Sequence, residues 1–208
     1  MELQDKIVVI TGAGSGIGRA LALRFQAEGA KQIVCADINL ANAQETADMI
    51  GGVAMLADVA KEEDTARIIE DTEANIGPID LFCCNAGVGY GESIHSPNEQ
   101  WQSIWDINVM SHVYAARHLV PRMVERGSGY FLNTSSAAGL LNQIGGAAYG
   151  VTKHAAVGFG EWLAIHHKHE GIGVSMLCPQ AVRTAMTAVD NDAVAAAANN
   201  GMIEPEEL

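Results

Sequence analysis

Short apolar, β-branched runs alternate along this chain with longer segments of helical periodicity, and this alternation limits the possible folds more than any other feature. The runs are continuously apolar, which indicates strands buried on both faces of a sheet. Strands separated by helices form parallel sheets through right-handed crossovers. We therefore expect an α/β fold with a doubly wound parallel sheet, helices on both faces, and ligands beyond the carboxyl ends of the strands. We expect strands at residues 6–10, 32–36, 53–56, 79–84, 129–134 and 173–178, and helices at 17–28, 40–50, 62–76, 97–126 and 147–169.

Length and charge limit the classes of function. The 208 residues suffice for one domain with a sizeable core, and no repeat or linker divides them. Twelve Lys and Arg against 25 Asp and Glu give a net charge of −13, which argues against nucleic acid or an anionic membrane as partner. No apolar run approaches the ~18 residues of a membrane span, and the charged first residues do not resemble a signal peptide.

The cysteines and histidines do not predict a metal site. The four cysteines lack metal-ligand spacing and lie in apolar runs, which is typical of reduced core thiols in a cytoplasmic protein. They are Cys35, Cys83, Cys84 and Cys178. His154, His166, His167 and His169 are candidate ligands, but the last three fall at a helix end, where such rings suit the helix dipole.

The last residues differ in composition from the rest. Residues 193–198 are rich in alanine and favour a short helix. Residues 204–207 combine a proline with acids, the composition of a first helical turn, and the sequence ends at Leu208. We expect that the natural protein continues or that this chain is a truncated form.

A glycine-rich segment at residues 11–18, TGAGSGIG, follows the first predicted strand and opens the first helix. Glycines permit a tight turn, close approach of the backbone to a pyrophosphate, and packing of helix on strand. The amides at the helix start then bind the anion. We predict a Rossmann-type dinucleotide site here; the alternative is an ordinary glycine-rich turn. The cofactor-binding candidates in this segment are Gly12, Ser15, Gly16, Ile17 and Gly18.

Asp37 ends the second predicted strand, 19 residues after Gly18. An acid at this point hydrogen-bonds the adenosine ribose hydroxyls and repels a 2′-phosphate. Neither Ser15 nor Ile38 supplies a cation for that phosphate, so we predict NAD rather than NADP. The alternative role for Asp37 is a cap on the helix that begins near Asn39.

Tyr149 and Lys153 are four residues apart in a predicted helix, so they share one face. Lowering a tyrosine pKa from about 10 to near 7 requires roughly 4 kcal/mol. Two unit charges ~4 Å apart at an effective dielectric of 20 interact by about 4 kcal/mol. The ammonium can therefore favour the phenolate, although most such pairs simply lie on a solvated helix edge. Ser135 and Ser136, at the end of the fifth predicted strand, add hydroxyls that can hold a substrate oxygen.

Five segments in this order resemble the short-chain dehydrogenase/reductase family over essentially the whole chain. They are TGAGSGIG at 11–18, CNAG at 84–87, NTSSAAG at 133–139, YGVTK at 149–153 and PQAVRT at 179–184. The resemblance implies Tyr149 as general acid/base, with Lys153 lowering its pKa and binding the nicotinamide ribose. Since the family's serine precedes its tyrosine by thirteen residues, Ser136 is preferred over Ser135.

The resemblance also assigns roles to other residues. It implies that Asn108 holds a water of the proton relay, although a buried asparagine is more often a hydrogen-bonded core amide. It implies adenine contacts by Asp58 and Val59, although Asp58 by itself is equally a cap. The other implied cofactor contacts are Asn85, Ala86 and Gly87 behind the adenosine, and Val182 and Thr184 at the carboxamide.

The sequence departs from the family pattern in two places. Gln180 stands where the family has a glycine, and the chain lacks the final helix and seventh strand of the usual sheet, which puts activity in doubt. We expect residues 180–203 to form a substrate loop or lid on a single domain, 1–208. The family's interface helix corresponds to residues 97–126, which implies a homo-oligomer, dimer or tetramer, although Trp101 and Trp105 suit a core equally well.

Three functions fit these observations. The first is an oxidoreductase that transfers a hydride between NAD and a small-molecule substrate, a neutral, moderately apolar secondary alcohol or its ketone. The second is an NADPH-dependent carbonyl reductase. The third is a non-catalytic nucleotide-binding or truncated form, which the missing final helix favours and the intact Ser136, Tyr149 and Lys153 oppose.

Overall fold

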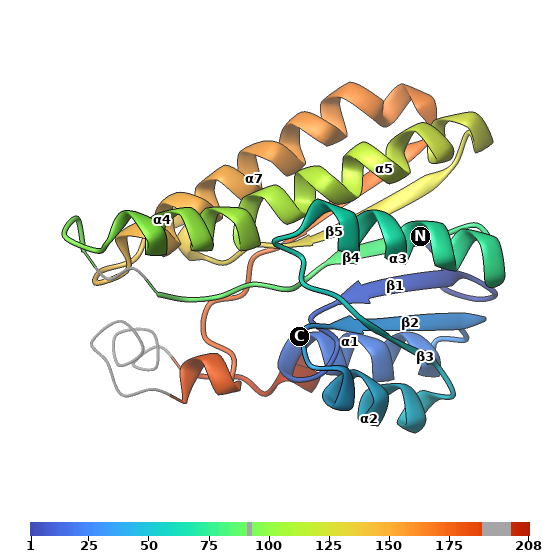
Figure 1. Cartoon of the computed structure of the whole chain (residues 1–208), viewed down its shortest axis with the longest axis horizontal. Helices are drawn as coiled ribbons and strands as arrows, with labels where there is room; N and C mark the ends of the chain where they lie inside the picture. The colour runs from blue at the N-terminus through green and yellow to red at the C-terminus, as the bar shows by residue number, and fades with distance from the viewer. Residues whose placement is uncertain (91–92, 189–200) are drawn as a thin grey trace.

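A computed structural model describes residues 1–90, 93–188 and 201–208, and in these residues a parallel sheet of six strands forms the centre of the molecule (Figure 1). Its order is β3-β2-β1-β4-β5-β6, so the direction of winding reverses between β1 and β4. The crevice at such a reversal is the usual ligand site of this architecture. The strands are β1 (Ile7–Thr11), β2 (Gln32–Asp37), β3 (Val53–Leu56), β4 (Leu81–Cys84), β5 (Gly129–Thr134) and β6 (Ile172–Leu177).

Helices cover both faces of the sheet, as predicted. Helices α1 (Gly16–Ala27) and α2 (Leu40–Ile50) pack on one face, and α3 (Glu62–Asn75), α5 (Ser111–Arg126) and α7 (Ala147–His167) on the other (Figure 1). Alternate strand residues point to opposite faces. Val8 and Ile10 of β1 join the core beneath α1 and α2, whereas Val9 joins the core beneath the other three helices. The continuous apolarity of the strands therefore reflects two separate cores.

The long helix expected at residues 97–126 is the main difference from the sequence prediction. The chain forms α4 (Asn98–Trp105), then a π-helical turn at Asp106–Met110, then α5. Periodicity does not distinguish these pieces because the backbone direction is maintained through the turn (Figure 1). A π-turn inside a helix is frequently found at a functional site.

Other boundaries differ by one or two residues. The strand expected to begin at residue 79 begins at Leu81, and a short helix that the sequence did not predict, α6 (Ala138–Leu141), precedes α7. The helix expected to reach residue 169 ends at His167, and a 3-10 turn follows at Lys168–Glu170. Gly127 ends α5 in the left-handed conformation, with φ 68°, as expected for a helix stop.

The last described residues return to the edge of the crevice. Val182 and Ile203 form a parallel bridge, the Arg183 amide donates to the Ile203 carbonyl (2.9 Å), and the Arg183 guanidinium pairs with Glu204 (2.7 Å). The predicted turn at 204–207 is a 3-10 turn, Pro205–Glu207, with a capping box, and it lies against α1 (Figure 1). The helix expected at 193–198 lies outside the described residues.

Two further findings concern the described residues. None of their helices has both the length and the apolarity needed to cross a membrane. The four cysteines are free thiols, and three of them are buried: Cys35, Cys83 and Cys84.

Candidate functional site

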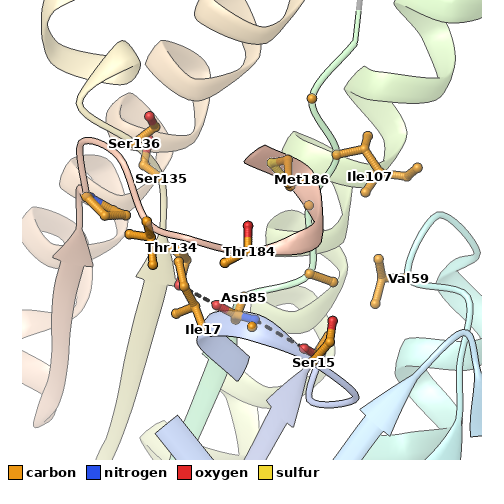
Figure 2. A pocket seen from close by; sticks show the side chains of 18 of the residues that line it. Ser15, Ile17, Val59, Asn85, Ile107, Thr134, Ser135, Ser136, Thr184 and Met186 are labelled. Atoms are coloured by element: carbon orange, nitrogen blue, oxygen red, sulfur yellow. Dashed lines mark hydrogen bonds between the residues drawn. The ribbon is translucent and has the colours of Figure 1, made fainter. Parts of the chain in front are cut away.

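A cleft of about 600 Å³ lies at the carboxyl ends of the central strands and is bordered by the glycine-rich loop, the segment after β4 and the segment after β6. Figure 2 shows Ser15 and Ile17 at its base, Ser136 at one end and Met186 beside Ile107 at another. Most of the predicted site residues line this one cleft. Those that do are Gly12, Ser15, Gly16, Ile17, Asp37, Asp58, Val59, Asn85, Ala86, Gly87, Ser136, Tyr149, Lys153, Val182 and Thr184.

The glycine loop passes close to neighbouring backbone. Gly12 has φ +66°, and a Cβ there would lie 2.9 Å from the Ala86 Cα. A Cβ on Gly18 would overlap the Gly12 carbonyl, which explains why this predicted residue does not itself line the cleft. Two positions thus require glycine, and the first residues of α1, Gly16 and Ile17, line the cleft. Such a cradle fits the pyrophosphate of a dinucleotide.

Asn85 connects the ends of three strands at the base of the cleft through hydrogen bonds. Its amide nitrogen donates to the Thr11 carbonyl (3.1 Å), and its amide oxygen accepts from the Thr134 hydroxyl (3.2 Å; Figure 2). The Thr11 hydroxyl accepts from the Asn85 backbone amide (3.0 Å). Asn85 therefore holds β1, β4 and β5 in fixed relation.

Asp37 connects the glycine loop to the start of α2. One carboxylate oxygen accepts from the Gly14 amide and the other from the Asn39 amide, both at 2.9 Å. The residue that caps α2 is Asn39, whose side chain accepts from the Asn42 amide, so Asp37 is not the cap. Asp37 also lines the cleft, and each of its carboxylate oxygens can accept more than one hydrogen bond.

Asp58 and Val59 lie on the segment that follows β3. The Asp58 carboxylate accepts from the Ala60 amide (3.1 Å) and lies 3.6 Å from the Lys61 ammonium. This turn role resembles the alternative that the sequence left open for Asp58. Both residues also line the cleft, with Val59 nearly buried.

The two serines after β5 have different partners. The Ser135 hydroxyl donates to the Lys153 backbone carbonyl (2.9 Å) and so ties β5 to α7. The Ser136 hydroxyl accepts from the Ala138 amide (3.1 Å) and lies near enough to the Tyr149 phenol to lower its pKa. Ser136 is thus the serine that lies near the Tyr149 phenol.

Tyr149 and Lys153 lie on one face of α7, as their spacing predicts. The Lys153 ammonium is 5.6 Å from the centre of the Tyr149 ring and donates to the Thr134 carbonyl (3.2 Å). Burial raises the pKa of Tyr149, and the nearby Ser136 hydroxyl opposes this rise. Burial also lowers the pKa of Lys153 to about 8. In the free protein burial therefore dominates the pKa of Tyr149, and its lowering by the ammonium stays a prediction.

Asn108 lies in the π-turn and is fully buried. Its side chain forms a two-way pair with Val88, accepting from the Val88 amide and donating to the Val88 carbonyl, both at 2.9 Å. It also donates to the Thr152 hydroxyl (3.2 Å). Asn108 does not line the cleft, and its contacts are those of a core amide that fixes the loop after β4.

The segment after β6 closes the cleft on one side. The Thr184 methyl lies 3.0 Å from the Cβ position of Gly16, and the Thr187 hydroxyl donates to the Val182 carbonyl (2.8 Å). Sequence reasoning missed Thr134 and Ile107, which also line the cleft, whereas Met186, another lining residue, lies in the segment 180–203 that was expected to form a substrate loop. Only Thr134 left a signal, since it directly precedes the serine pair.

Comparison with known proteins gives a consistent result. A model of the short chain dehydrogenase family matches residues 6–195. The 1-deoxy-11-beta-hydroxypentalenate dehydrogenase of Streptomyces exfoliatus is 35% identical over 195 residues, covering 89% of this chain and 70% of that protein. A structure from Beutenbergia cavernae with bound NADP has a TM-score of 0.90 and 29% identity, covering 99% of this chain and 87% of that one. A short-chain dehydrogenase/reductase from Burkholderia phymatum in complex with NAD has a TM-score of 0.86 and 28% identity, covering 96% of this chain and 79% of that one.

Proposed function

This chain belongs to the short-chain dehydrogenase family, a family of hydride-transfer oxidoreductases, and from that premise we propose that it interconverts a neutral secondary alcohol and its ketone with NAD. The observation that carries the proposal is the convergence of Ser136, Tyr149 and Lys153 at one end of the cleft. The glycine loop borders the same cleft, so a nicotinamide cofactor and these groups would share one space.

Each of the three side chains would have a separate task. Tyr149, the general acid/base, would take the proton of the substrate hydroxyl or return it to the ketone oxygen. Ser136 lies near the phenol, whose pKa it lowers, and would orient the substrate oxygen beside it. Lys153 would favour the phenolate and hold the nicotinamide ribose, while Asn108 would fix the loop over this end through its pair with Val88.

The cofactor would supply the hydride acceptor or donor, and the chain's own groups fit its parts. The amides of the glycine loop would hold the pyrophosphate, and Val182 with Thr184 would meet the carboxamide. Asp58, Val59 and the segment Asn85 to Gly87 would surround the adenosine, with Asp37 on its ribose hydroxyls.

Charge in the cleft supports NAD over NADP. Within the described residues, the charged side chains that line the cleft are Asp37, Asp58 and Lys153, so a 2′-phosphate at the adenosine end would meet carboxylates. Arg19, just after the glycine loop, is engaged by Glu45 (2.8 Å) and by the Gly14 carbonyl (2.6 Å). Removing the carboxylate should therefore weaken NAD and relieve repulsion of NADP.

The Asp37→Ala variant tests this assignment. We expect its kcat/KM ratio of NADP to NAD to rise at least tenfold over the wild-type ratio. Glu45→Ala, which removes one partner of Arg19 but leaves Asp37, is the matched control and should change the ratio less. A wild-type ratio that already favours NADP would support the NADPH-dependent carbonyl reductase instead.

The Tyr149→Phe variant tests the chemistry itself. It should abolish hydride transfer, measured as NADH absorbance with a panel of secondary alcohols, while its NAD dissociation constant stays within about threefold. A loss of about a thousandfold or more is expected, because both proton transfer and oxygen orientation are affected. A wild-type chain that binds NAD but turns over no alcohol in the panel would refute the proposal and support the non-catalytic form.

The exposed aromatic side chains of α4 and α7 support a homo-oligomer. Trp105 is 38% exposed and Trp162 50% exposed, and Ile165 is 80% exposed on the same helix as Trp162. Large exposed apolar side chains on neighbouring elements favour a protein interface. We expect light scattering to give the molar mass of a dimer or tetramer for the wild type, and Ile165→Glu to lower that mass toward the monomer. The same molar mass for the wild type and the variant would contradict an interface at this surface.

A further inference from the structure

The substrate end of the cleft is bordered by a glycine on one side and a methionine on the other. Gly89 lies on the loop after β4, and Met186 lies in the 3-10 turn Ala185–Thr187 after β6. A Cβ on Gly89 would lie 3.4 Å from the Met186 sulfur and 3.8 Å from Cδ2 of the Tyr149 ring. The missing side chain at position 89 therefore leaves space directly between the phenol and the methionine.

The backbone does not require glycine at this position. Unlike Gly12, Gly89 does not have a positive φ, and an added methyl would meet its neighbours at ordinary van der Waals distances. An alanine is therefore compatible with the fold here, and its methyl would occupy the space beside the phenol. What glycine provides at position 89 is room.

The walls around this space are apolar. Met186 lies beside Ile107 (Figure 2), and Val88 and Tyr90 complete the lining on the loop side. The Tyr90 hydroxyl is paired with the Ser103 hydroxyl at 2.6 Å, which leaves mainly its ring for other contacts. Met186 is 42% exposed, and the unbranched, flexible methionine side chain adapts to groups of different shape.

We propose that Gly89 and Met186 together set the size limit of the apolar substituent carried by the reacting carbon of the substrate. The proposal rests on the proposed function, since it assumes that the substrate oxygen lies at Tyr149. Gly89 provides the width of the opening, and Met186 is the wall that moves to accommodate the substituent. The substrates it favours are neutral secondary alcohols whose larger substituent fills the space between these two residues.

Two opposite substitutions test the proposal. The kcat/KM values of Gly89→Ala, Met186→Ala and the wild type are measured for propan-2-ol, hexan-2-ol and 1-phenylethanol, with NAD saturating. We expect Gly89→Ala to lower kcat/KM for 1-phenylethanol about tenfold and that for propan-2-ol less than twofold, because one methyl in a pocket changes selectivity by this order. Met186→Ala should change the ratio in the opposite direction. Met49→Ala, an exposed methionine on α2, is the matched control and should leave the ratio unchanged.

The outcomes separate this inference from the function on which it rests. If the wild type oxidises these alcohols and both variants keep its selectivity ratio, the size limit lies elsewhere and the inference is wrong. If Gly89→Ala lowers all three values equally, Gly89 acts on folding or cofactor binding, which also refutes it. If the wild type oxidises none of a broad alcohol panel, the proposed function fails first and the size limit fails with it.

Discussion

His112 of α5 is a buried imidazole that should make the stability of this protein depend on pH. The side chain is 1% exposed, and neither ring nitrogen has a hydrogen-bond partner of good geometry among the described residues. Burial, together with the nearby Lys153 charge, lowers the pKa of His112 to about 3, and the adjacent Asn133 side chain only partly opposes this. The imidazole is therefore neutral in the folded protein throughout the neutral and mildly acid range.

The size of the effect follows from proton binding in the two states. An unfolded histidine has a pKa of about 6.5, so between that value and about 3 the unfolded chain binds a proton that the folded chain does not. The free energy of unfolding must therefore fall as the pH falls below 6.5. Lowering the pH from 7.5 to 5.0 should cost about 2 kcal/mol at this one residue, since each pH unit below 6.5 costs about 1.4 kcal/mol.

The assay compares the wild type with His112→Leu, which keeps similar volume and removes the titrating group. Urea unfolding is followed by tryptophan fluorescence at pH 7.5, 6.5, 5.5 and 5.0. Between pH 7.5 and 5.0 the free energy of unfolding of the variant should rise by about 2 kcal/mol relative to that of the wild type. His95→Leu, which removes an exposed histidine, should show the same pH dependence as the wild type. Parallel wild-type and His112→Leu curves between pH 7.5 and 5.0 would refute the reasoning, because they would mean that the folded protein protonates His112 as readily as the unfolded chain.

Three further changes have defined outcomes. Gly18→Ala places a methyl against the Gly12 carbonyl, so it should lower the free energy of unfolding by about 3 kcal/mol. It should also abolish NAD binding in calorimetry, and a near-wild-type affinity would contradict the role of the glycine loop in holding the pyrophosphate. Glu73→Ala removes a carboxylate, 14% exposed, that joins α3 to two arginines of α5, and should cost about 1–3 kcal/mol in urea unfolding, whereas Glu28→Ala, in an exposed pair, should cost less than about 0.5. Ser136→Ala should lower kcat more than a hundredfold, while Ser135→Ala should largely retain kcat. Each variant loses one buried bond to the backbone, so both should lower the melting temperature to a similar extent; equal effects on kcat would refute the choice between the two serines.

The sheet could be predicted from the sequence because its strands carry the whole signal locally. Ile7 to Ile10 is apolar at every position, and the structure buries all four residues between two helical layers. The π-turn at Asp106–Met110 could not be predicted, because its cause is a long-range contact. Asn108 pairs with the backbone of Val88, twenty residues away in the sequence, and a periodicity over neighbouring residues contains no information about that bond.

The cleft shows the same division between local and long-range causes. The glycines and Asp37 follow directly from strand ends and could be placed from the sequence. Ile107 could not, because it is an ordinary apolar residue that becomes a cleft wall only where the π-turn lies beside the segment after β6, and for Met186 the sequence indicated the loop but not its neighbour (Figure 2). The neighbours of Gly89 could not be predicted either, because the sequence does not show which side chains lie near a glycine in the folded chain.

The Tyr149 and Lys153 pair shows where reasoning from charge alone is incomplete. Spacing gives the shared helix face correctly, and the Lys153 ammonium lies 5.6 Å from the centre of the Tyr149 ring, near enough to attract a phenolate. The burial that strengthens this attraction also removes water from both groups, which favours the neutral phenol and the neutral amine. Burial accordingly raises the pKa of Tyr149 and lowers that of Lys153 to about 8, so the two pKa values move in opposite directions from those that the attraction alone would give. In the free protein burial therefore favours the protonated phenol, and the nearby Ser136 hydroxyl acts in the opposite direction by lowering the pKa of Tyr149.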